Sequence, residues 1–283
     1  MLPVLFHLPG GHPVYAYGVM LGLSLVVGFQ VTVRLAQRDA GVDRDLCGNA
    51  CLAAVLAGVV GARLSYVAIN RELVEDVLGR WWNIQSGGLM GIGGLVAGFA
   101  AASAYLRAKR APVLAVADAA TPAIAIGIVF TRIGSYLYGS DFGVRLDDGA
   151  PELLRTLGTF PRWQDSALFG APAFAYHVDR FGLARDALAA YPVHPVQLYA
   201  ALFGALLLGL SLVFRRSSGF SGQAFLRFAV VYGVGTFLLA YLRADPDRGM
   251  AFGFTASQLA SLVIIPVAVI AHSQLKRANS GSS

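Results

Sequence analysis

Arg132 interrupts an otherwise apolar stretch, "IAIGIVFTRIGSYLYGSDFG", which covers residues 124–143. A permanent charge inside a segment with the composition of a membrane span is costly and usually functional. If the segment is helical, Ser135, Tyr136 and Gly139 share one face with Arg132, and Asp141 follows just beyond. A guanidinium, a hydroxyl and a phenol on one face indicate the wall of a polar site. Packing of the aromatic residues alone is the alternative.

Two further arginines fall near the ends of other apolar stretches, Arg63 in "GVVGARLSYV" and Arg243 in "FLLAYLRADPDRG". The three arginines are expected at a similar depth in three different helices. The alternative is snorkelling, in which a terminal arginine reaches the head-group layer. Snorkelling explains Arg243 better, because Asp245 and Asp247 follow at once.

The sequence also predicts what neutralises these arginines. Within the apolar windows the only acidic residue is Asp118, which lies about 20 Å from Arg132 along the same predicted helix at 1.5 Å per residue. We therefore expect no carboxylate of this chain to neutralise the arginines. Backbone carbonyls, water or an anionic ligand would do so instead. A lipid phosphate is the anion available in an outer leaflet, and it suits a planar guanidinium.

Other polar residues are expected at the same level as the arginines. They open three further apolar stretches: Tyr15 and Tyr17; a glycine run that includes Gly93 and Gly94; and His194, Gln197 and Tyr199. Interfacial aromatic belts and helix packing at small residues explain tyrosines and glycines without a site. A bent or unwound glycine segment lining a polar cavity is the other interpretation.

The elements that position these residues follow from composition. The chain has 283 residues, of which 56% are hydrophobic and 13% charged, and its mean hydropathy is +0.62. Soluble domains carry about 25% charged residues. We predict an all-α polytopic membrane protein, one domain over residues 1–283, with apolar windows of bilayer length at 15–34, 48–69, 88–106, 114–138, 196–214, 223–242 and 254–272. The start of the chain has no basic region typical of a signal peptide.

Charges between the windows predict the orientation. Basic residues fall in alternate loops and in the tail: Arg34, Arg38, Arg44, Arg107, Lys109, Arg110, Arg215, Arg216, Lys276 and Arg277. Alternate loops lie on one side, which is cytoplasmic by the positive-inside rule, so the N-terminus is outside. This topology accounts for the net charge of +6 without nucleic-acid binding. Residues 139–195 form a long outer loop, predicted as a small head. Cys47 and Cys51 have no further ligands nearby, so packing explains them.

Six segments, in order, resemble the prolipoprotein diacylglyceryl transferase family of bacterial inner-membrane enzymes. "TRIGSYLYGSDFG" is similar to the family signature Gly-Arg-x-Gly-Asn-x-x-Asn-Gly-Glu-x-x-Gly, with Arg132 in register and Gly134 retained. "HPVQLY" resembles its His-Pro-x-Gln-Leu-Tyr segment. The remaining four are "VYAYGVM", "GARLSYV", "GGLMGIGGL" and "YGVGTFLLAYLRAD". Each segment is weak alone, but together they span nearly the whole chain.

The resemblance implies a seven-span bundle and a reaction. The family transfers the diacylglyceryl group of phosphatidylglycerol to the lipobox cysteine thiol of a preprolipoprotein, and no metal or organic cofactor is needed. Arg132 would hold the donor phosphate, Arg243 would add a second positive contact, and Asp141 or His194 would transfer a proton. The expected substrate-binding residues are Arg132, Arg63, Tyr17, Ser135, Gly134, Gln197, Tyr199, Gly93 and Gly94.

The chain also departs from the family pattern at polar positions. Ile92 stands in place of a histidine, and Ser140 in place of the signature glutamate. The other departures are Ser135, Tyr138, Ala200, Thr236 and Ala240. Three hypotheses follow: a divergent transferase whose acceptor is altered or unaltered, a paralogue that binds anionic phospholipid without turnover, and a transporter. The transporter is least favoured, because we find no paired broken helices in repeated halves.

Overall fold

The computed structural model describes residues 3–69, 90–163, 171–245 and 250–281. In this part of the chain, seven helices are long and apolar enough to cross a bilayer. They are α1 (Ala16–Ala40), α2 (Arg44–Ile69), α4 (Gly91–Ala108), α5 (Val113–Tyr138), α8 (Val196–Arg216), α9 (Gln223–Leu239) and α10 (Ala256–Ser280). The predicted all-α membrane fold is confirmed.

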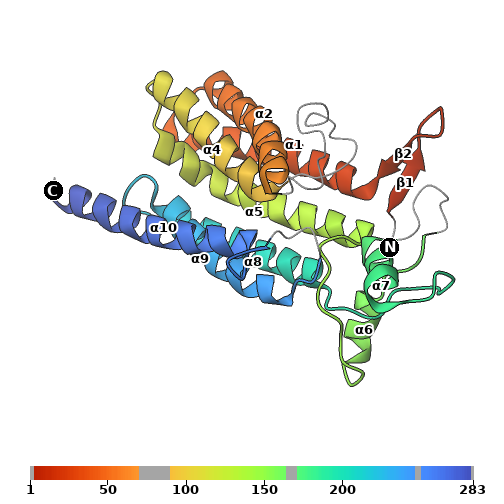
Figure 1. The fold of residues 1–283 in the computed structure, drawn as a ribbon. Helices are drawn as coiled ribbons and strands as arrows, with labels where there is room; N and C mark the ends of the chain where they lie inside the picture. Colours follow the sequence, from red (N-terminus) through yellow and green to blue (C-terminus); the bar gives the residue numbers. More distant parts are fainter. Residues whose placement is uncertain (1–2, 70–89, 164–170, 246–249, 282–283) are drawn as a thin grey trace.

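Helix α5 lies at the centre of the bundle (Figure 1). Helices α1, α2 and α4 lie on one side of it, and α8, α9 and α10 lie on the other. Small residues allow these close crossings, as at Gly204 of α8, where a Cβ would lie 2.9 Å from the side chain of Ile128 on α5. Strand β1 (Val4–His7) and the end of α10 lie at opposite ends of the bundle (Figure 1), as seven spans among the described residues require.

Asp118 joins α5 to α9 at the end of the bundle that carries the C-terminus. Its carboxylate oxygens accept hydrogen bonds from the backbone N–H groups of Gly222 (2.6 Å) and Phe225 (2.7 Å), at the start of α9. These are N–H groups that a helix leaves without internal partners. The one acidic residue of the predicted apolar windows therefore serves as a cap for a neighbouring helix.

The short elements gather mainly at the other end of the bundle. Helices α6 (Glu152–Gly158) and α7 (Pro172–Phe181) lie beyond the end of α5, and strands β1 (Val4–His7) and β2 (Pro13–Tyr15) form a hairpin before α1. A short 3-10 helix, η3 (Ala240–Leu242), extends α9, and the hairpin of β3 (Met250–Ala251) and β4 (Phe254–Thr255) precedes α10.

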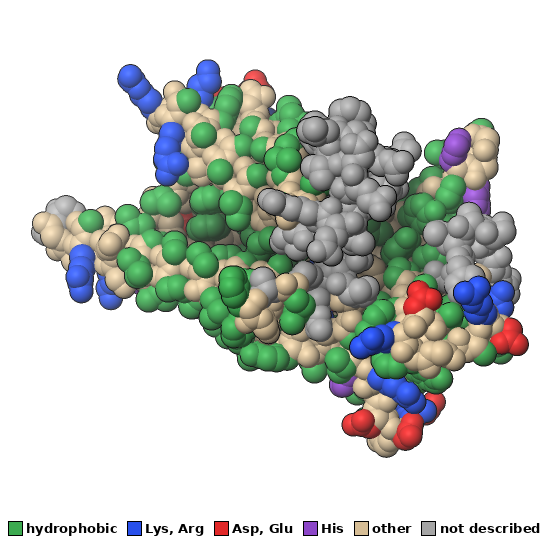
Figure 2. Space-filling view, in the orientation of Figure 1, with side chains coloured by type: hydrophobic (Ala, Val, Ile, Leu, Met, Phe, Trp, Pro, Cys, Tyr) green, Lys and Arg blue, Asp and Glu red, His purple; other side chains and the backbone are tan. Residues whose placement is uncertain are grey.

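The surface separates these two regions. Figure 2 shows hydrophobic side chains over the flanks of the bundle, whereas acidic and basic side chains gather over α6 and α7. In the segment between α5 and α8, the buried aromatic residues Phe142, Phe160 and Phe174 form a separate core with Val193 and Trp163. The predicted outer loop thus contains a packed unit, which rests on the chain directly after α5.

Candidate functional site

Three segments that are far apart in sequence are joined by backbone hydrogen bonds at the end of α5. Gly143 donates to the carbonyl of His194 (3.0 Å), and His194 donates to Val144 (2.9 Å). On the other side, Val144 donates to Leu242 (2.8 Å), and Ala244 donates to Phe142 (3.1 Å). The chain after α5 therefore lies between the segment before α8 and the segment after α9. This ladder places Asp141, His194 and Arg243 close together.

Asp141 is the central acceptor of an ion network in this region. Its Oδ2 accepts hydrogen bonds from Arg132 Nη1 (2.8 Å) and Ser135 Oγ (2.9 Å), and its Oδ1 accepts one from Arg243 Nη2 (2.7 Å). Arg243 is also held by Asp245, through Nε–Oδ1 (2.8 Å) and Nη2–Oδ2 (2.7 Å) bonds. An arginine of α5 and an arginine of the extended segment after η3 thus share one carboxylate.

This network corrects the prediction that no carboxylate of the chain neutralises Arg132. The prediction considered acidic residues inside the apolar windows, and Asp141 lies three residues beyond the end of α5. The chain reverses there, because Gly139 (φ +80°) and Asp141 (φ +55°) adopt left-handed backbone conformations. Aspartate tolerates this conformation better than most residues do. The turn directs the Asp141 carboxylate back onto the helix face that carries Arg132 and Ser135.

The network contains two arginines and two aspartates, so its charges balance. Asp141 and Arg243 each favour the ionised form of the other. Burial alone would raise the pKa of Asp141, but the nearby Arg132 and Arg243 charges outweigh burial and hold the pKa below its ordinary value. Burial likewise opposes the charge on Arg243, yet Asp141 and Asp245 raise the pKa of Arg243 above its ordinary value. The ion network therefore favours the charged forms of Asp141 and Arg243.

The two arginines differ in what they can still bind. The side chain of Arg243 is 18% exposed, and two of its nitrogens donate to Asp141 and Asp245. The side chain of Arg132 is 32% exposed, and among the described residues its hydrogen bonding runs through Nη1 alone. Arg132 is thus the guanidinium that can accept a further anion, and Arg243 positions the shared carboxylate. Asp245 also belongs to the network. The sequence indicates this contact, because Asp245 follows Arg243 by two residues.

Gly134 and Tyr17 lie on the side of α5 that faces α1. A Cβ on Gly134 would lie 3.0 Å from the Met20 Cβ and 3.2 Å from the Tyr17 Cα, so glycine allows α1 to approach α5 closely. Tyr17 remains partly exposed, and the electrostatic influence of Asp141 and Arg132 reaches its hydroxyl group. Tyr17 therefore borders the site, whereas Gly134 shapes the helix crossing.

Gln197, His194 and Tyr199 come from the start of α8. Gln197 is fully buried, and its Nε2 donates to the carbonyl of Ser140, which ties α8 to the turn after α5. Its Oε1 has no hydrogen-bond partner among the described residues. His194 Nδ1 lies 3.3 Å from the Tyr199 hydroxyl group. An imidazole with one nitrogen held by a phenol is a candidate for proton transfer through the other nitrogen.

Three of the predicted substrate-binding residues have no contact with this network among the described residues: Arg63, Gly93 and Gly94. Arg63 is buried in α2, with its guanidinium 5.6 Å from the centre of the Tyr66 ring. Gly93 and Gly94 lie inside α4 and face α2, where a Cβ on Gly94 would lie 2.9 Å from the Gly58 carbonyl oxygen. The structure therefore favours helix packing for the two glycines over the predicted substrate contact. Gly87 and Gly88, the first two glycines of the segment "GGLMGIGGL", lie outside the described residues.

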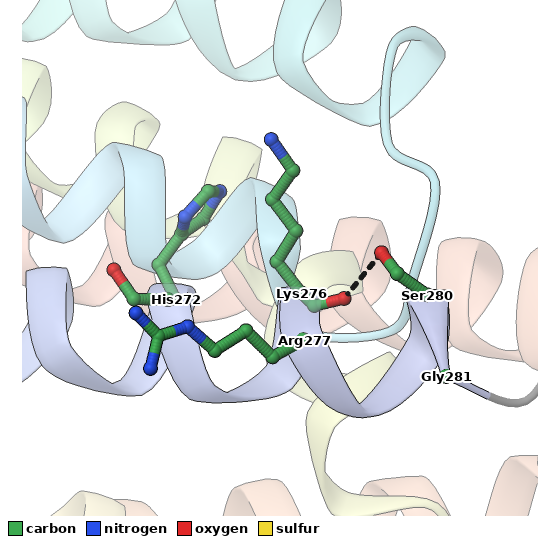
Figure 3. A pocket seen from close by; sticks show the side chains of 6 residues that line it. His272, Lys276, Arg277, Ser280 and Gly281 are labelled. Atoms are coloured by element: carbon green, nitrogen blue, oxygen red, sulfur yellow. Dashed lines mark hydrogen bonds between the residues drawn. The ribbon is translucent and has the colours of Figure 1, made fainter.

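A hollow of about 610 Å³ lies near the other end of the bundle, beside the last turns of α10. Figure 3 shows that His272, Lys276 and Arg277 project from this one helix, and the Ser280 hydroxyl donates to the Lys276 carbonyl group (2.9 Å). All residues that line the hollow belong to the end of α10. It is thus a surface beside a basic helix end, separate from the Arg132 network.

Comparisons with known proteins agree with this arrangement. Residues 3–273 match the family model described as prolipoprotein diacylglyceryl transferase. Proteins named phosphatidylglycerol--prolipoprotein diacylglyceryl transferase are similar over almost the full length of both chains. The protein from Thermus thermophilus is 33% identical, over 94% of this chain and 95% of its own. The protein from Clostridium tetani is 26% identical, over 95% of this chain and 96% of its own. The chain therefore belongs to the prolipoprotein diacylglyceryl transferase family.

Proposed function

We propose that this protein transfers the diacylglyceryl group of phosphatidylglycerol to the lipobox cysteine thiol of a prolipoprotein, and that Arg132 holds the donor phosphate. Family membership supports the reaction. One observation supports Arg132 as the phosphate-binding residue. Its guanidinium lies at the end of an apolar helix, donates to Asp141 through Nη1 and is 32% exposed. Bidentate binding of a phosphate by a guanidinium needs two free N–H groups on one edge, and Arg132 retains them.

The reaction substitutes sulfur for oxygen at the glyceryl carbon of the donor. The cysteine thiol loses its proton, the thiolate sulfur forms a bond to this carbon, and the bond between the carbon and the phosphate oxygen breaks. The electron pair of that bond leaves with glycerol phosphate. Arg132 stabilises the negative charge that grows on the departing phosphate, the kind of contact that accelerates reactions most.

His194 is the better of the two predicted proton acceptors. Asp141 is engaged by two arginines and a hydroxyl group, and its lowered pKa makes it a weak base. In the tautomer whose Nδ1–H donates to the Tyr199 hydroxyl oxygen, Nε2 of His194 is free to accept the thiol proton. With this assignment, His194 accepts the thiol proton. The chain needs such an acceptor, because it has Ile92 where the family resemblance places a histidine.

The proposed orientation follows from the charges of the chain. The basic residues near the ends of α4, α8 and α10 are assigned to the cytoplasmic side of a bacterial inner membrane. The Arg132 network, α6 and α7 then lie at the outer surface, where a prolipoprotein emerges. The donor reaches the network laterally from the outer leaflet.

A transfer assay tests the function. The purified chain in nanodiscs that contain phosphatidylglycerol receives a lipobox peptide, and mass spectrometry scores the thioether-linked diacylglyceryl product. Wild type should form product, and Arg132→Gln should lower the rate by about 100- to 1,000-fold, the usual cost of losing one charge-stabilising donor. Arg132→Lys should fall between them, because it keeps the charge without the planar fork.

Arg155→Gln is the matched control, since Arg155 is a cation of α6 that donates to the Asp148 carbonyl oxygen. It should retain the wild-type rate. His194→Gln should lower turnover without loss of donor binding. A wild-type protein that retains phosphatidylglycerol and forms no thioether product would contradict the transferase proposal, as would full activity in Arg132→Gln.

A further inference from the structure

An apolar groove runs along the lipid-facing side of α9, beside α8. Its volume is about 480 Å³, and Phe203 of α8 and six residues of α9 between Val230 and Leu239 line it. All of these side chains are apolar. The groove is therefore suited to hydrocarbon rather than to a polar ligand.

Two glycines of α9 explain why the groove exists. A Cβ on Gly233 would lie 2.8 Å from the side chain of Ile265, so this glycine allows α10 to approach. Gly235 faces the opposite neighbour, and a Cβ there would overlap the ring of Phe203. The Phe203 ring thus lies directly against the α9 backbone and forms the floor of the groove.

The groove leads toward the ion network. Val231, Gly235 and Leu239 follow one another at four-residue spacing, which places them on one face of α9. Arg243 follows four residues after Leu239 and bonds to Asp141, the carboxylate that also holds Arg132. A molecule whose phosphate lies at this network would have its tail begin beside Leu239, at the end of the groove nearest to the network.

The dimensions match one acyl chain. The lining of α9 from Val230 to Leu239 spans about 14 Å at 1.5 Å per residue, and one leaflet of the hydrocarbon core is about 15 Å thick.

We propose that this groove binds one acyl chain of the donor phospholipid, and that Phe203 sets which chains fit. The proposal rests on the proposed function for the identity of the donor. A straight chain lies along the groove over the Phe203 ring. A methyl branch finds no recess in the floor of the groove, because the Phe203 ring lies directly against the Gly235 backbone.

Competition between lipids in nanodiscs tests the groove. The full chain is offered equal amounts of phosphatidylglycerol with straight saturated chains and with methyl-branched chains, and native mass spectrometry measures which lipid stays bound. Wild type should prefer the straight-chain lipid. Phe203→Ala should shift the ratio toward the branched lipid by about fivefold or more. Gly235→Ala should lower the retention of both lipids, because the displaced ring fills the groove.

Leu202→Ala is the matched control, because Leu202 is 71% exposed on the same helix and does not line the groove. It should leave the ratio at the wild-type value. Equal ratios in wild type, Phe203→Ala and Leu202→Ala would overturn the proposal. So would a Phe203→Ala protein whose KM for the lipobox peptide changes while the lipid ratio does not.

The two proposals fail in different ways in this experiment. Both lipids carry the same head group and the measurement needs no turnover, so an inactive protein still reports its chain preference. Arg132→Gln should weaken retention of both lipids equally and keep their ratio. If lipid retention does not depend on Arg132 but the lipid ratio still depends on Phe203, the proposed phosphate site is wrong and the proposed acyl-chain groove is supported.

Discussion

At the scale of single residues, Asp141 determines what Arg132 can do. An arginine at the end of an apolar helix is exposed to any anion in the head-group layer. Asp141 fixes one nitrogen of this guanidinium and, through Arg243, ties it to the segment after α9 and η3. A donor phosphate then meets a guanidinium whose position is already set, and preorganised charge of this kind costs no rearrangement during the reaction.

Asp141→Asn should lower the thermal stability of the protein most at neutral pH. The pKa of Asp141 is below its ordinary value in the folded chain, so its ionised form stabilises the fold above pH 4, roughly the ordinary aspartate pKa. This contribution is lost as the pH falls through the lowered value. The loss at pH 7 should be about 1–3 kcal/mol, since these partly exposed ion pairs contribute less than fully buried ones.

Melting temperatures in detergent at pH 7 and pH 3 provide the measurement. The difference between wild type and Asp141→Asn should be largest at pH 7 and should shrink at pH 3. Asp148→Asn, at an exposed carboxylate between α5 and α6, is the control and should change little at either pH. A difference of the same size at both pH values would show that the charge of Asp141 does not act in this way.

At the scale of elements, the sequence predicted all seven spans, and their ends were the least certain part. Helix α1 continues to Ala40, beyond the predicted end at residue 34, and ends where Gly41 adopts a left-handed conformation (φ +62°). Helices α8 and α10 likewise run past their apolar windows through Arg216 and through Arg277. Hydropathy locates the hydrocarbon core, but helix ends depend on caps and on snorkelling side chains, which extend beyond it.

Gly61→Ala should destabilise the packing of α2 against α4. A Cβ on Gly61 would collide with Ala97 and lie 2.6 Å from the Gly93 carbonyl oxygen. Small residues in membrane helices allow such close contact between backbones. Overpacking of this kind costs about 1–3 kcal/mol, which should lower the melting temperature in detergent by several degrees.

Gly22→Ala is the control for this substitution. Gly22 lies in the middle of α1, and a Cβ there would have no neighbour within 4 Å. This variant should match or slightly exceed the wild-type melting temperature, because alanine favours helix. If Gly61→Ala is as stable as Gly22→Ala, α2 and α4 do not pack as described.

At the scale of the whole molecule, the sequence predicted the membrane fold and the family but not the assembly of the site. Arg132 stood out because it interrupts an apolar run. Its partner Asp141 was missed, because only acidic residues inside the apolar windows were considered and the left-handed turn after α5 was not foreseen. The positions of His194 and Arg243 beside this turn depend on backbone hydrogen bonds between segments about 50 and 100 residues apart. Periodicity and composition report local structure, and such pairings depend on how the bundle closes.

The whole molecule, as proposed, is a bundle that presents one anchored arginine to phospholipids of the outer leaflet. The most direct test is the affinity for phosphatidylglycerol of the full chain, wild type and Arg132→Gln, in nanodiscs otherwise made of phosphatidylcholine. Losing charge-assisted bonds of 1.5–3 kcal/mol should weaken phosphatidylglycerol binding by about 10- to 100-fold, while Arg155→Gln binds like wild type. Equal affinity in wild type and Arg132→Gln would contradict the account.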